Sequence, residues 1–204
     1  ALQSYLNFMY HTNKISFTLD GKEVSAEDGE TIWQAAARLG TDIPHLCYKD
    51  DAGYRPDGNC RACMVEIEGE RVLAASCIRA PTEGMIVNSQ SHRATTARRM
   101  VMELLVSDQP DREVAHDPSS ELWKYAADQE IETGRFPAKF SPEPDSSHPA
   151  IAVNMDACIQ CGLCVRACRE VQVNDVIGLA GRGADAHIVF DFGDDMGAST
   201  CVGC

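Results

Sequence analysis

The sequence lacks several features that would narrow its function. Aromatic residues are only 6% of the 204 residues, whereas the remaining hydrophobic content is ordinary for a globular protein. No apolar run reaches the length of about 18 residues that a membrane-spanning helix needs. Residues 1–13 show no basic segment followed by an apolar one, so no secretory signal peptide is predicted. These absences indicate a soluble protein of the cytoplasm without a membrane partner.

Basic residues are also scarce, with 18 Lys and Arg against 31 Asp and Glu and a formal net charge of −13. Acidic residues outnumber basic ones in the first, middle and last parts of the chain. This balance argues against nucleic acid and anionic lipid as partners. Acidity usually serves solubility, although it also suits electron carriers that dock on basic proteins.

Cysteine, in contrast, is abundant, with ten residues. Without an export signal, such a number favours metal ligation over disulfides. The densest motif has the spacing C-x2-C-x2-C-x3-C and consists of Cys158, Cys161, Cys164 and Cys168. The first three thiolates suit three corners of a [4Fe–4S] cubane, and Gly162 lets the loop curl closely around it. Structural zinc is the alternative, but zinc usually takes two separated pairs.

A second C-x2-C step follows at Cys201 and Cys204. In two-cluster ferredoxin domains the fourth Cys of one motif ligates the other cluster. The first cubane is therefore expected on Cys158, Cys161 and Cys164, and the second on Cys168, Cys201 and Cys204. Six thiolates are present where two cubanes need eight. We therefore expect the missing pair three and seven positions past Cys204, in a longer subunit of which this chain is a truncated copy.

Another metal signal precedes these motifs. Cys47 is followed by Cys60, Cys63 and Cys77, so that a tight pair lies between two more distant thiols. Plant-type [2Fe–2S] ferredoxins have C-x4-C-x2-C and a distant fourth Cys, and only the first gap is longer here. These four residues are predicted to bind one [2Fe–2S] cluster, with loop amides donating to the sulfurs. Four scattered buried cysteines, or a zinc site, are the weaker alternatives.

The elements around this second motif predict an α+β domain over residues 14–90. Alternation over 14–20 indicates a strand, Asp20-Gly21 a turn, and 22–25 a returning strand. A capping box at Thr31 and Gln34 starts a helix over 31–39 that Gly40 ends, with an inward stripe of Ile32, Ala35, Ala36 and Leu39. Residues 64–68 and 71–75 form the next hairpin, with Cys63 before it and Cys77 after it. This order is typical of a β-grasp fold.

The rest of the chain divides into further segments. Residues 1–13 are expected to be an N-terminal tail, 91–133 a helical connector, 134–149 a Pro- and Ser-rich linker, and 150–204 a two-[4Fe–4S] ferredoxin-like domain. One helix is predicted over 91–107 and another from Asp117-Pro118. A short strand over 151–154, a helix over 165–173 and strands over 176–179 and 187–192 complete the pattern. No metal is expected between His92 and Ser147, because that segment holds no Cys.

Predicted inward faces follow from the helical periodicity. In the 91–107 helix they are Ala97, Met100, Val101, Leu104 and Leu105, with Arg98 on the solvated side. In the next helix they are Leu122, Trp123 and Ala126.

With both motifs placed, the chain resembles three related families. They are the large cluster-bearing subunit of respiratory complex I, the iron-only hydrogenases, and the α subunit of cytoplasmic NAD-dependent formate dehydrogenase. The first two typically carry a His-x3-Cys-x2-Cys-x5-Cys site after the [2Fe–2S] domain. Here that position reads Leu104 to Asp111, and no Cys lies between Cys77 and Cys158. That departure favours the molybdenum- or tungsten-dependent formate dehydrogenases. The sequence segments from Met100 to Pro110 and from Cys158 to Ile177 are also similar to those of this family.

That resemblance implies an electron-transfer segment between a molybdenum or tungsten bis-pterin centre and a flavin (FMN) and NAD site. The pterin centre is expected in the remainder of the α subunit. The implied partners are a flavin- and NAD-binding β subunit and a small [2Fe–2S] γ subunit. No catalytic formate-binding residue is assigned in these 204 residues. Three alternatives stay open: a hydrogenase or complex-I-like segment, a stand-alone polyferredoxin, and a zinc-stabilised interaction module without redox chemistry.

Overall fold

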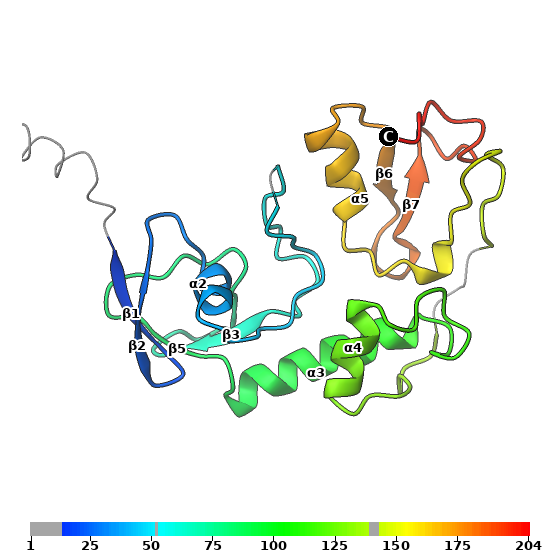
Figure 1. The fold of residues 1–204 in the computed structure, drawn as a ribbon. Coiled ribbons are helices and arrows are strands. Elements are labelled where there is room, and N and C mark those ends of the chain that lie inside the picture. Colours follow the sequence, from blue (N-terminus) through cyan, green and yellow to red (C-terminus); the bar gives the residue numbers. More distant parts are fainter. Residues whose placement is uncertain (1–13, 52, 139–142) are drawn as a thin grey trace, which may run out of the picture. The chain divides into compact units, whose positions relative to one another are not determined.

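A computed structural model describes residues 14–51, 53–138 and 143–204. The expected tail over 1–13 lies outside the described residues. The chain divides into two compact units. The first contains the chain up to Ile43 together with Cys63–Ala97, and the second contains Pro44–Ala62 together with Arg98–Cys204. Each unit is described separately below (Figure 1).

The first unit is built on a five-stranded mixed sheet (Figure 1). Its strands are β1 (Ile15–Leu19), β2 (Lys22–Ala26), β3 (Met64–Ile67), β4 (Ala74–Ala75) and β5 (Ile86–Asn88), in the order β2-β1-β5-β3-β4. β1 pairs with β5 in parallel, and the other pairings are antiparallel. With helix α2 (Ile32–Arg38), this arrangement confirms the predicted β-grasp fold.

Local sequence signals explain the beginning of this unit. Gly21 turns the β1–β2 hairpin with φ 79°, a conformation that favours glycine. The predicted capping box is present, since the Thr31 hydroxyl accepts the N–H of Gln34 and the Gln34 side chain accepts the N–H of Thr31. The prediction that Leu39 faces inward is wrong. Leu39 is 46% exposed, and Trp33 is buried instead because its Nε1–H donates to the Ile43 carbonyl at 2.9 Å.

The sequence pattern gave no indication of β5, although this strand lies at the centre of the sheet. Its neighbours supply the explanation. Thr18 N–H donates to the Met85 carbonyl at 2.8 Å, and Asp20 N–H to the Val87 carbonyl at 2.9 Å. The Asp20 carboxylate then accepts hydrogen bonds from the backbone and hydroxyl of Ser89 at 2.6 and 2.7 Å. Long-range pairing therefore defines a strand that is too short for a periodic signal.

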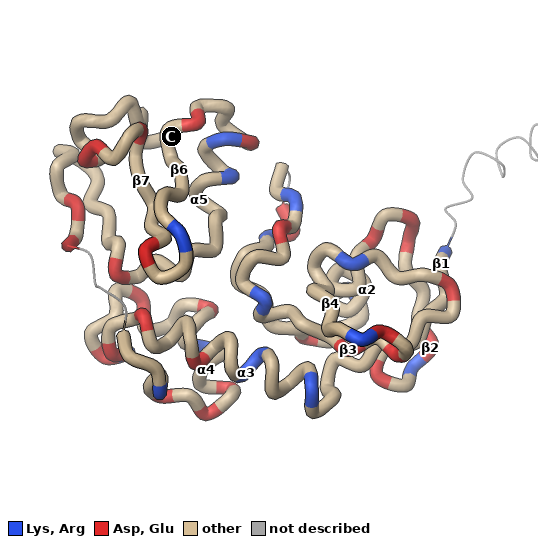
Figure 2. Tube along the Cα trace, turned by 180° about the vertical axis from the view of Figure 1, so that it is seen from behind, with Lys and Arg blue, Asp and Glu red and all other residues tan. Residues whose placement is uncertain are grey.

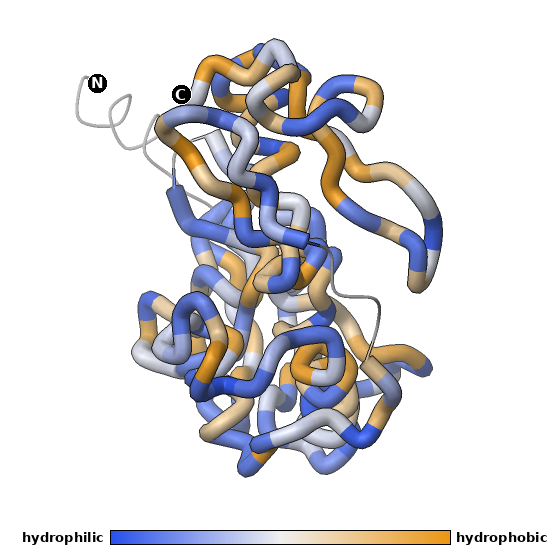
Figure 3. The backbone as a smooth tube through the Cα atoms, turned by 90° about the vertical axis from the view of Figure 1, so that its right-hand side faces the viewer, coloured by the Kyte–Doolittle hydropathy of each residue, from blue (hydrophilic) through white to orange (hydrophobic). Residues whose placement is uncertain are grey.

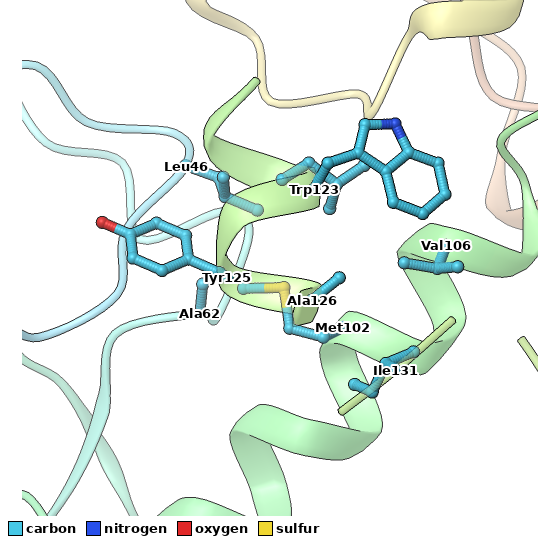
Figure 4. Close-up of a cluster of buried hydrophobic side chains, with 9 residues drawn as sticks. Leu46, Ala62, Met102, Val106, Trp123, Tyr125, Ala126 and Ile131 are labelled. Atoms are coloured by element: carbon cyan, nitrogen blue, oxygen red, sulfur yellow. The ribbon is translucent and has the colours of Figure 1, made fainter. Parts of the chain in front are cut away.

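Helix α3 (His92–Ser107) begins in the first unit and ends in the second, and α4 (Glu121–Asp128) follows it. Between them lies the largest core of the second unit, shown in Figure 4. The buried members of this core are Leu46, Ala62, Met102, Val106, Leu122, Trp123, Tyr125, Ala126 and Ile131. The prediction that Leu122, Trp123 and Ala126 face inward is therefore confirmed.

The predicted inward face of α3 is wrong at two positions, whereas Leu105 packs against the core as predicted. Met100 and Leu104 are 37% and 50% exposed, whereas Met102 is fully buried and Arg98 is 5% exposed. The buried stripe carries polar members, because Glu103 accepts a hydrogen bond from Arg135 at 2.6 Å. A pattern that counted only apolar residues therefore missed the polar members of the buried face and included two exposed residues.

The predicted start of the second helix is also wrong. Asp117 caps a turn instead, since its Oδ1 accepts Ser119 N–H at 2.9 Å and the Ser119 hydroxyl at 2.7 Å. Ser120 is the N-cap residue of α4. The Asp117-Pro118 pair therefore marks a turn, and Asp117 lies three residues before the N-cap residue of α4.

The C-terminal part of the second unit contains a hairpin and a short helix. The hairpin pairs β6 (Ile177–Ala180) with β7 (His187–Phe190), close to the predicted strands, and η3 (Gly183–Asp185) lies within its connection. The predicted 165–173 helix is α5 (Leu163–Arg166) followed by the π-helical turn η2 (Ala167–Val171). The predicted 151–154 strand is reduced to one bridge between Asp145 and Val153, followed by η1 (Met155–Ala157).

Hydrophobic and hydrophilic residues alternate over short distances along the chain (Figure 3). Within the described ranges, no helix is both long and apolar enough to span a bilayer.

Candidate metal centres

The β3–β4 hairpin of the first unit positions Cys63 and Cys77. Met64 pairs with Ala75, so Cys63 directly precedes one strand and Cys77 closely follows the other, as predicted. Ser76 fixes the two ends, because its N–H and its hydroxyl both donate to the Cys63 carbonyl, at 3.1 and 2.8 Å. Both thiols are fully buried. The hairpin therefore presents two protected sulfurs at one end of the sheet.

The loop over 44–62 of the second unit brings Cys47 and Cys60 together. Cys60 N–H donates to the Cys47 sulfur at 3.3 Å, and Ala62 N–H donates to the Cys60 sulfur at 3.5 Å. A hydrogen bond with the Cys47 side chain, reinforced by burial, raises the pKa of the Cys60 thiol. The amides of Cys60 and Ala62 thus donate to these sulfurs, whereas the expectation that amides of the 48–59 loop bind the sulfurs of a cluster stays a prediction. Such donors stabilise thiolate charge once a metal has displaced the proton.

The first cubane motif lies on the loop before α5. Gln160 N–H donates to the Cys158 sulfur at 3.4 Å, and Gly162 has φ 74°, which favours glycine at the start of the helix. Burial is the main cause that raises the pKa of the Cys161 thiol, and the neighbouring charges of Cys158 and Cys47 raise it further. Because Cys47 affects Cys161, the two cysteine loops of the second unit lie within electrostatic reach of each other.

Cys168 lies apart from that loop, in η2. Its buried sulfur accepts N–H groups of Val176 and Ile177 at 3.2 and 3.5 Å. It belongs to a small core with Val176, Phe190 and Met196, against which Cys201 packs. Cys204 is exposed, with its sulfur 3.8 Å from the Asn174 side-chain amide. Cys168 and Cys201 therefore lie at the same small core, and their ligation of one cluster stays a prediction.

The donor set fits iron–sulfur clusters. None of the ten cysteines forms a disulfide, and at least one backbone N–H faces the sulfur of Cys47, Cys60, Cys158 and Cys168. In the part of the chain that the structure describes, no three Cys, His, Asp or Glu side chains converge as they would around a single ion. Cluster ligands are spaced more widely, because iron and sulfide separate them. Soft thiolates with amide donors suit iron–sulfur chemistry.

Sequence reasoning missed the residues that hold the two cysteine loops of the second unit together. Arg166 is 4% exposed and donates to the backbone carbonyls of Cys47 and Arg55. Asn59 donates from its side-chain amide to the Gln160 carbonyl at 2.7 Å. An arginine inside the Cys-x3-Cys step was the only available signal, and a side chain so placed is usually exposed.

Acidic residues outnumber basic ones over the whole chain, by 31 to 18. Figure 2 shows both kinds distributed over the two units. Arg166 differs from most of the basic residues because its charge is buried next to the loop of Cys47.

Comparisons with known proteins agree with this geometry. Residues 12–92 match the 2Fe-2S iron-sulfur cluster binding domain family, and residues 148–200 match the family of the NADH-quinone oxidoreductase subunit 3 ferredoxin-like domain.

Among curated proteins, the NADP-reducing hydrogenase subunit HndD of Solidesulfovibrio fructosivorans is 35% identical, over 93% of this chain and 34% of its own length. The mitochondrial NADH-ubiquinone oxidoreductase 78 kDa subunit of Candida albicans is also 35% identical, over 86% of this chain and 25% of its own length. The chain thus spans about a quarter to a third of these relatives.

A chain of a solved NAD+-reducing [NiFe]-hydrogenase in the H2-reduced state is 28% identical with a TM-score of 0.79, over 92% of this chain and 80% of that one. None of these relatives is a formate dehydrogenase. The chain therefore consists of a 2Fe–2S ferredoxin-like domain followed by a 4Fe–4S ferredoxin-like domain, homologous to subunits of hydrogenase and of NADH-quinone oxidoreductase.

Proposed function

We propose that this chain is the iron–sulfur electron-transfer segment of a multi-subunit, NAD-linked oxidoreductase of the hydrogenase or complex I kind. The observation that carries the proposal is the placement of Cys47 and Cys60 in the same compact unit as the Cys158–Cys164 motif. Two cluster loops held in one unit suit the transfer of electrons from one cluster to the next. This reading replaces formate dehydrogenase as the first choice, because the relatives named above support it better.

The proposed ligands follow the cysteine motifs. Cys47, Cys60, Cys63 and Cys77 would hold a [2Fe–2S] cluster. Cys158, Cys161 and Cys164 would contribute to a first [4Fe–4S] cluster, and Cys168, Cys201 and Cys204 to a second. Such clusters supply one-electron redox chemistry when bound. The chain contributes burial, which excludes water from the sulfurs of Cys47, Cys63, Cys77 and Cys168. It also contributes amide donors, which stabilise the negative charge of thiolates.

Partners follow from the same proposal. A subunit that binds NAD or NADP is expected to exchange electrons with this segment, as the names of the relatives suggest. The flavin expected in that subunit follows only from the resemblance described above. The acidic composition of the chain, with 31 Asp and Glu against 18 Lys and Arg, favours docking on basic faces of such a partner. A location in the cytoplasm would keep the thiols reduced for cluster assembly.

Formate dehydrogenase remains a second candidate because of one specific observation. The sequence has no Cys between Cys77 and Cys158. It therefore lacks the extra His- and Cys-ligated site that is typical of the large complex I subunit and of the iron-only hydrogenases. In that case the further cofactors would be molybdenum or tungsten bis-pterin, FMN and NAD, with a flavin-binding β subunit and a small [2Fe–2S] γ subunit as partners.

Purification of the native complex through a tag on this chain tests the choice. Reduction of NAD or NADP by hydrogen, or quinone reduction by NADH, would support the first candidate. Reduction of NAD by formate would support the second. A monomer without partner subunits would overturn both in favour of a stand-alone electron carrier, and stoichiometric zinc without iron and sulfide would overturn any redox role.

A further inference from the structure

Arg166 is a buried cation in the second unit. Its side chain is 5% exposed, and its guanidinium makes two hydrogen bonds and one ion pair. Nη2 donates to the Cys47 carbonyl, Nη1 donates to the Arg55 carbonyl, and Nε lies 3.1 Å from Asp57 Oδ2. A planar guanidinium with several N–H donors suits two carbonyls and a neighbouring carboxylate on one loop, which a lysine ammonium matches poorly.

Surrounding groups extend this contact into a network. Arg55 Nη1 donates to Asp57 at 2.9 Å, and Arg55 also pairs with Glu170 at 2.8 Å. Gly53 approaches Val171 so closely that an added Cβ would lie 3.3 Å from a Val171 methyl group. The loop over 44–62 is therefore held on α5 and η2 by charge and by close packing.

Arg166 lies close in sequence to one cysteine motif and donates a hydrogen bond to a residue of the other. Arg166 follows Cys164 by two residues, and its acceptor is the carbonyl of Cys47 itself. One side chain therefore connects the two cysteine motifs of this unit. Burying a cation is costly unless it is paired and hydrogen-bonded, so a merely structural link would be expected to use neutral groups.

We propose that Arg166 is a positioning residue that joins the Cys47–Cys60 loop to the Cys158–Cys164 motif, and that its buried charge favours the reduced form of the clusters on either side. The inference rests on the proposed cluster sites. A fixed cation lowers the energy of the added electron, and low polarity strengthens this effect. The same hydrogen bonds hold the two motifs at one separation, which single-electron transfer requires.

Two substitutions separate charge from geometry in the full-length, cluster-loaded subunit. Arg166→Gln removes the positive charge. Arg166→Lys keeps the charge but loses the planar guanidinium with its several N–H donors. Arg169→Gln is the matched control, because Arg169 lies three residues later, is 55% exposed and pairs with Asp175. Redox titration followed by electron paramagnetic resonance gives the [2Fe–2S] potential. Hydrogen exchange of the amides over 47–60 reports the attachment of the loop.

Arg166→Gln is expected to lower the equilibrium constant for [2Fe–2S] reduction about tenfold, which is about 59 mV for one electron. Arg166→Lys is expected to keep the potential within about threefold on the same scale. Both variants should exchange the loop amides at least about tenfold faster, because a buried pair is broken. Arg169→Gln should change neither quantity by more than about threefold.

An Arg166→Gln variant with the potential and the exchange rates of Arg169→Gln would overturn the inference. If Arg166→Gln does not fold, the exchange rates of Arg166→Lys decide, and unchanged rates would overturn it. Iron and sulfide analysis of the wild-type protein tests the proposed function separately. Wild-type protein without iron and sulfide would contradict the proposed function, whatever the variants show.

Discussion

Asn59 donates a hydrogen bond from its side-chain amide to the backbone carbonyl of Gln160 at 2.7 Å. Asn59 directly precedes Cys60, and Gln160 directly precedes Cys161. The contact therefore joins corresponding positions of two cysteine motifs that lie far apart in the sequence. Together with Arg166, it makes the loop over 44–62 a part of the second unit.

Substitution of Asn59 should loosen this loop. Asn59→Ala removes a hydrogen bond worth about 1 kcal/mol, so amides over 53–60 should exchange roughly fivefold faster. Gln172→Ala, an exposed amide side chain of the same unit, serves as the control and should leave exchange unchanged. Equal protection in Asn59→Ala and wild type would show that the contact does not hold the loop.

Gly134 is a site where even a methyl group has no room. A Cβ there would lie 2.6 Å from both Cα and Cβ of Ser107, at the end of α3. Gly134→Ala should therefore destabilise the second unit by about 1–3 kcal/mol, because the helix end must shift. Urea unfolding followed by Trp123 fluorescence measures the loss. Gly178→Ala, whose Cβ would meet Val189 at 3.6 Å, is the tolerated control, and similar midpoints for both variants would contradict the account.

Asp145 provides a pH-dependent contact. Hydrogen bonds from the Ser147 side chain and from Met196 N–H lower the pKa of the Asp145 carboxyl below its ordinary value of 3.8. A depressed carboxyl pKa contributes stability above the ordinary value, and this contribution is lost as pH falls through the lower, folded-state pKa.

Asp145→Asn should therefore be less stable than wild type near neutral pH. The difference should shrink as pH falls below 3.8, where the wild-type carboxyl begins to take up its proton. Urea unfolding of both proteins at pH 7 and at about pH 3 gives the comparison. A gap of the same size at both pH values would contradict the assigned role of the carboxylate.

Much of the fold could be predicted because its signals are local. The Thr31–Gln34 capping box, the Asp20-Gly21 turn and the order of strands and cysteines each depend on a few neighbouring residues. The cysteine spacing predicted both domains because cluster ligation restricts where thiols can lie.

Other features depend on contacts between distant residues and gave no local signal. β5 is only three residues long and exists because β1 and β3 pair with it. The buried face of α3 includes Arg98 and Glu103, which no apolar pattern would place inside. The burial of Arg166 gave no local signal, because the carbonyls to which it donates lie 111 and 119 residues earlier in the chain.

Separation of the two kinds of cluster is a further expectation. Cys168→Ser should disturb the second [4Fe–4S] cluster and leave the [2Fe–2S] cluster intact, because Cys168 lies with Cys201 in a separate core. Iron and sulfide content together with the [2Fe–2S] paramagnetic signal measures this. Loss of the [2Fe–2S] signal in Cys168→Ser, with the protein still folded, would contradict the assignment.

Electron paramagnetic resonance of the dithionite-reduced protein tests the central claim most directly, by comparing wild type with Cys60→Ser and Cys158→Ser. The account predicts a [2Fe–2S] signal in wild type, its loss in Cys60→Ser and its retention in Cys158→Ser, since Cys60 and Cys158 belong to different clusters. A wild-type protein with zinc and no paramagnetic signal, or a [2Fe–2S] signal that survives in Cys60→Ser and disappears in Cys158→Ser, would contradict it.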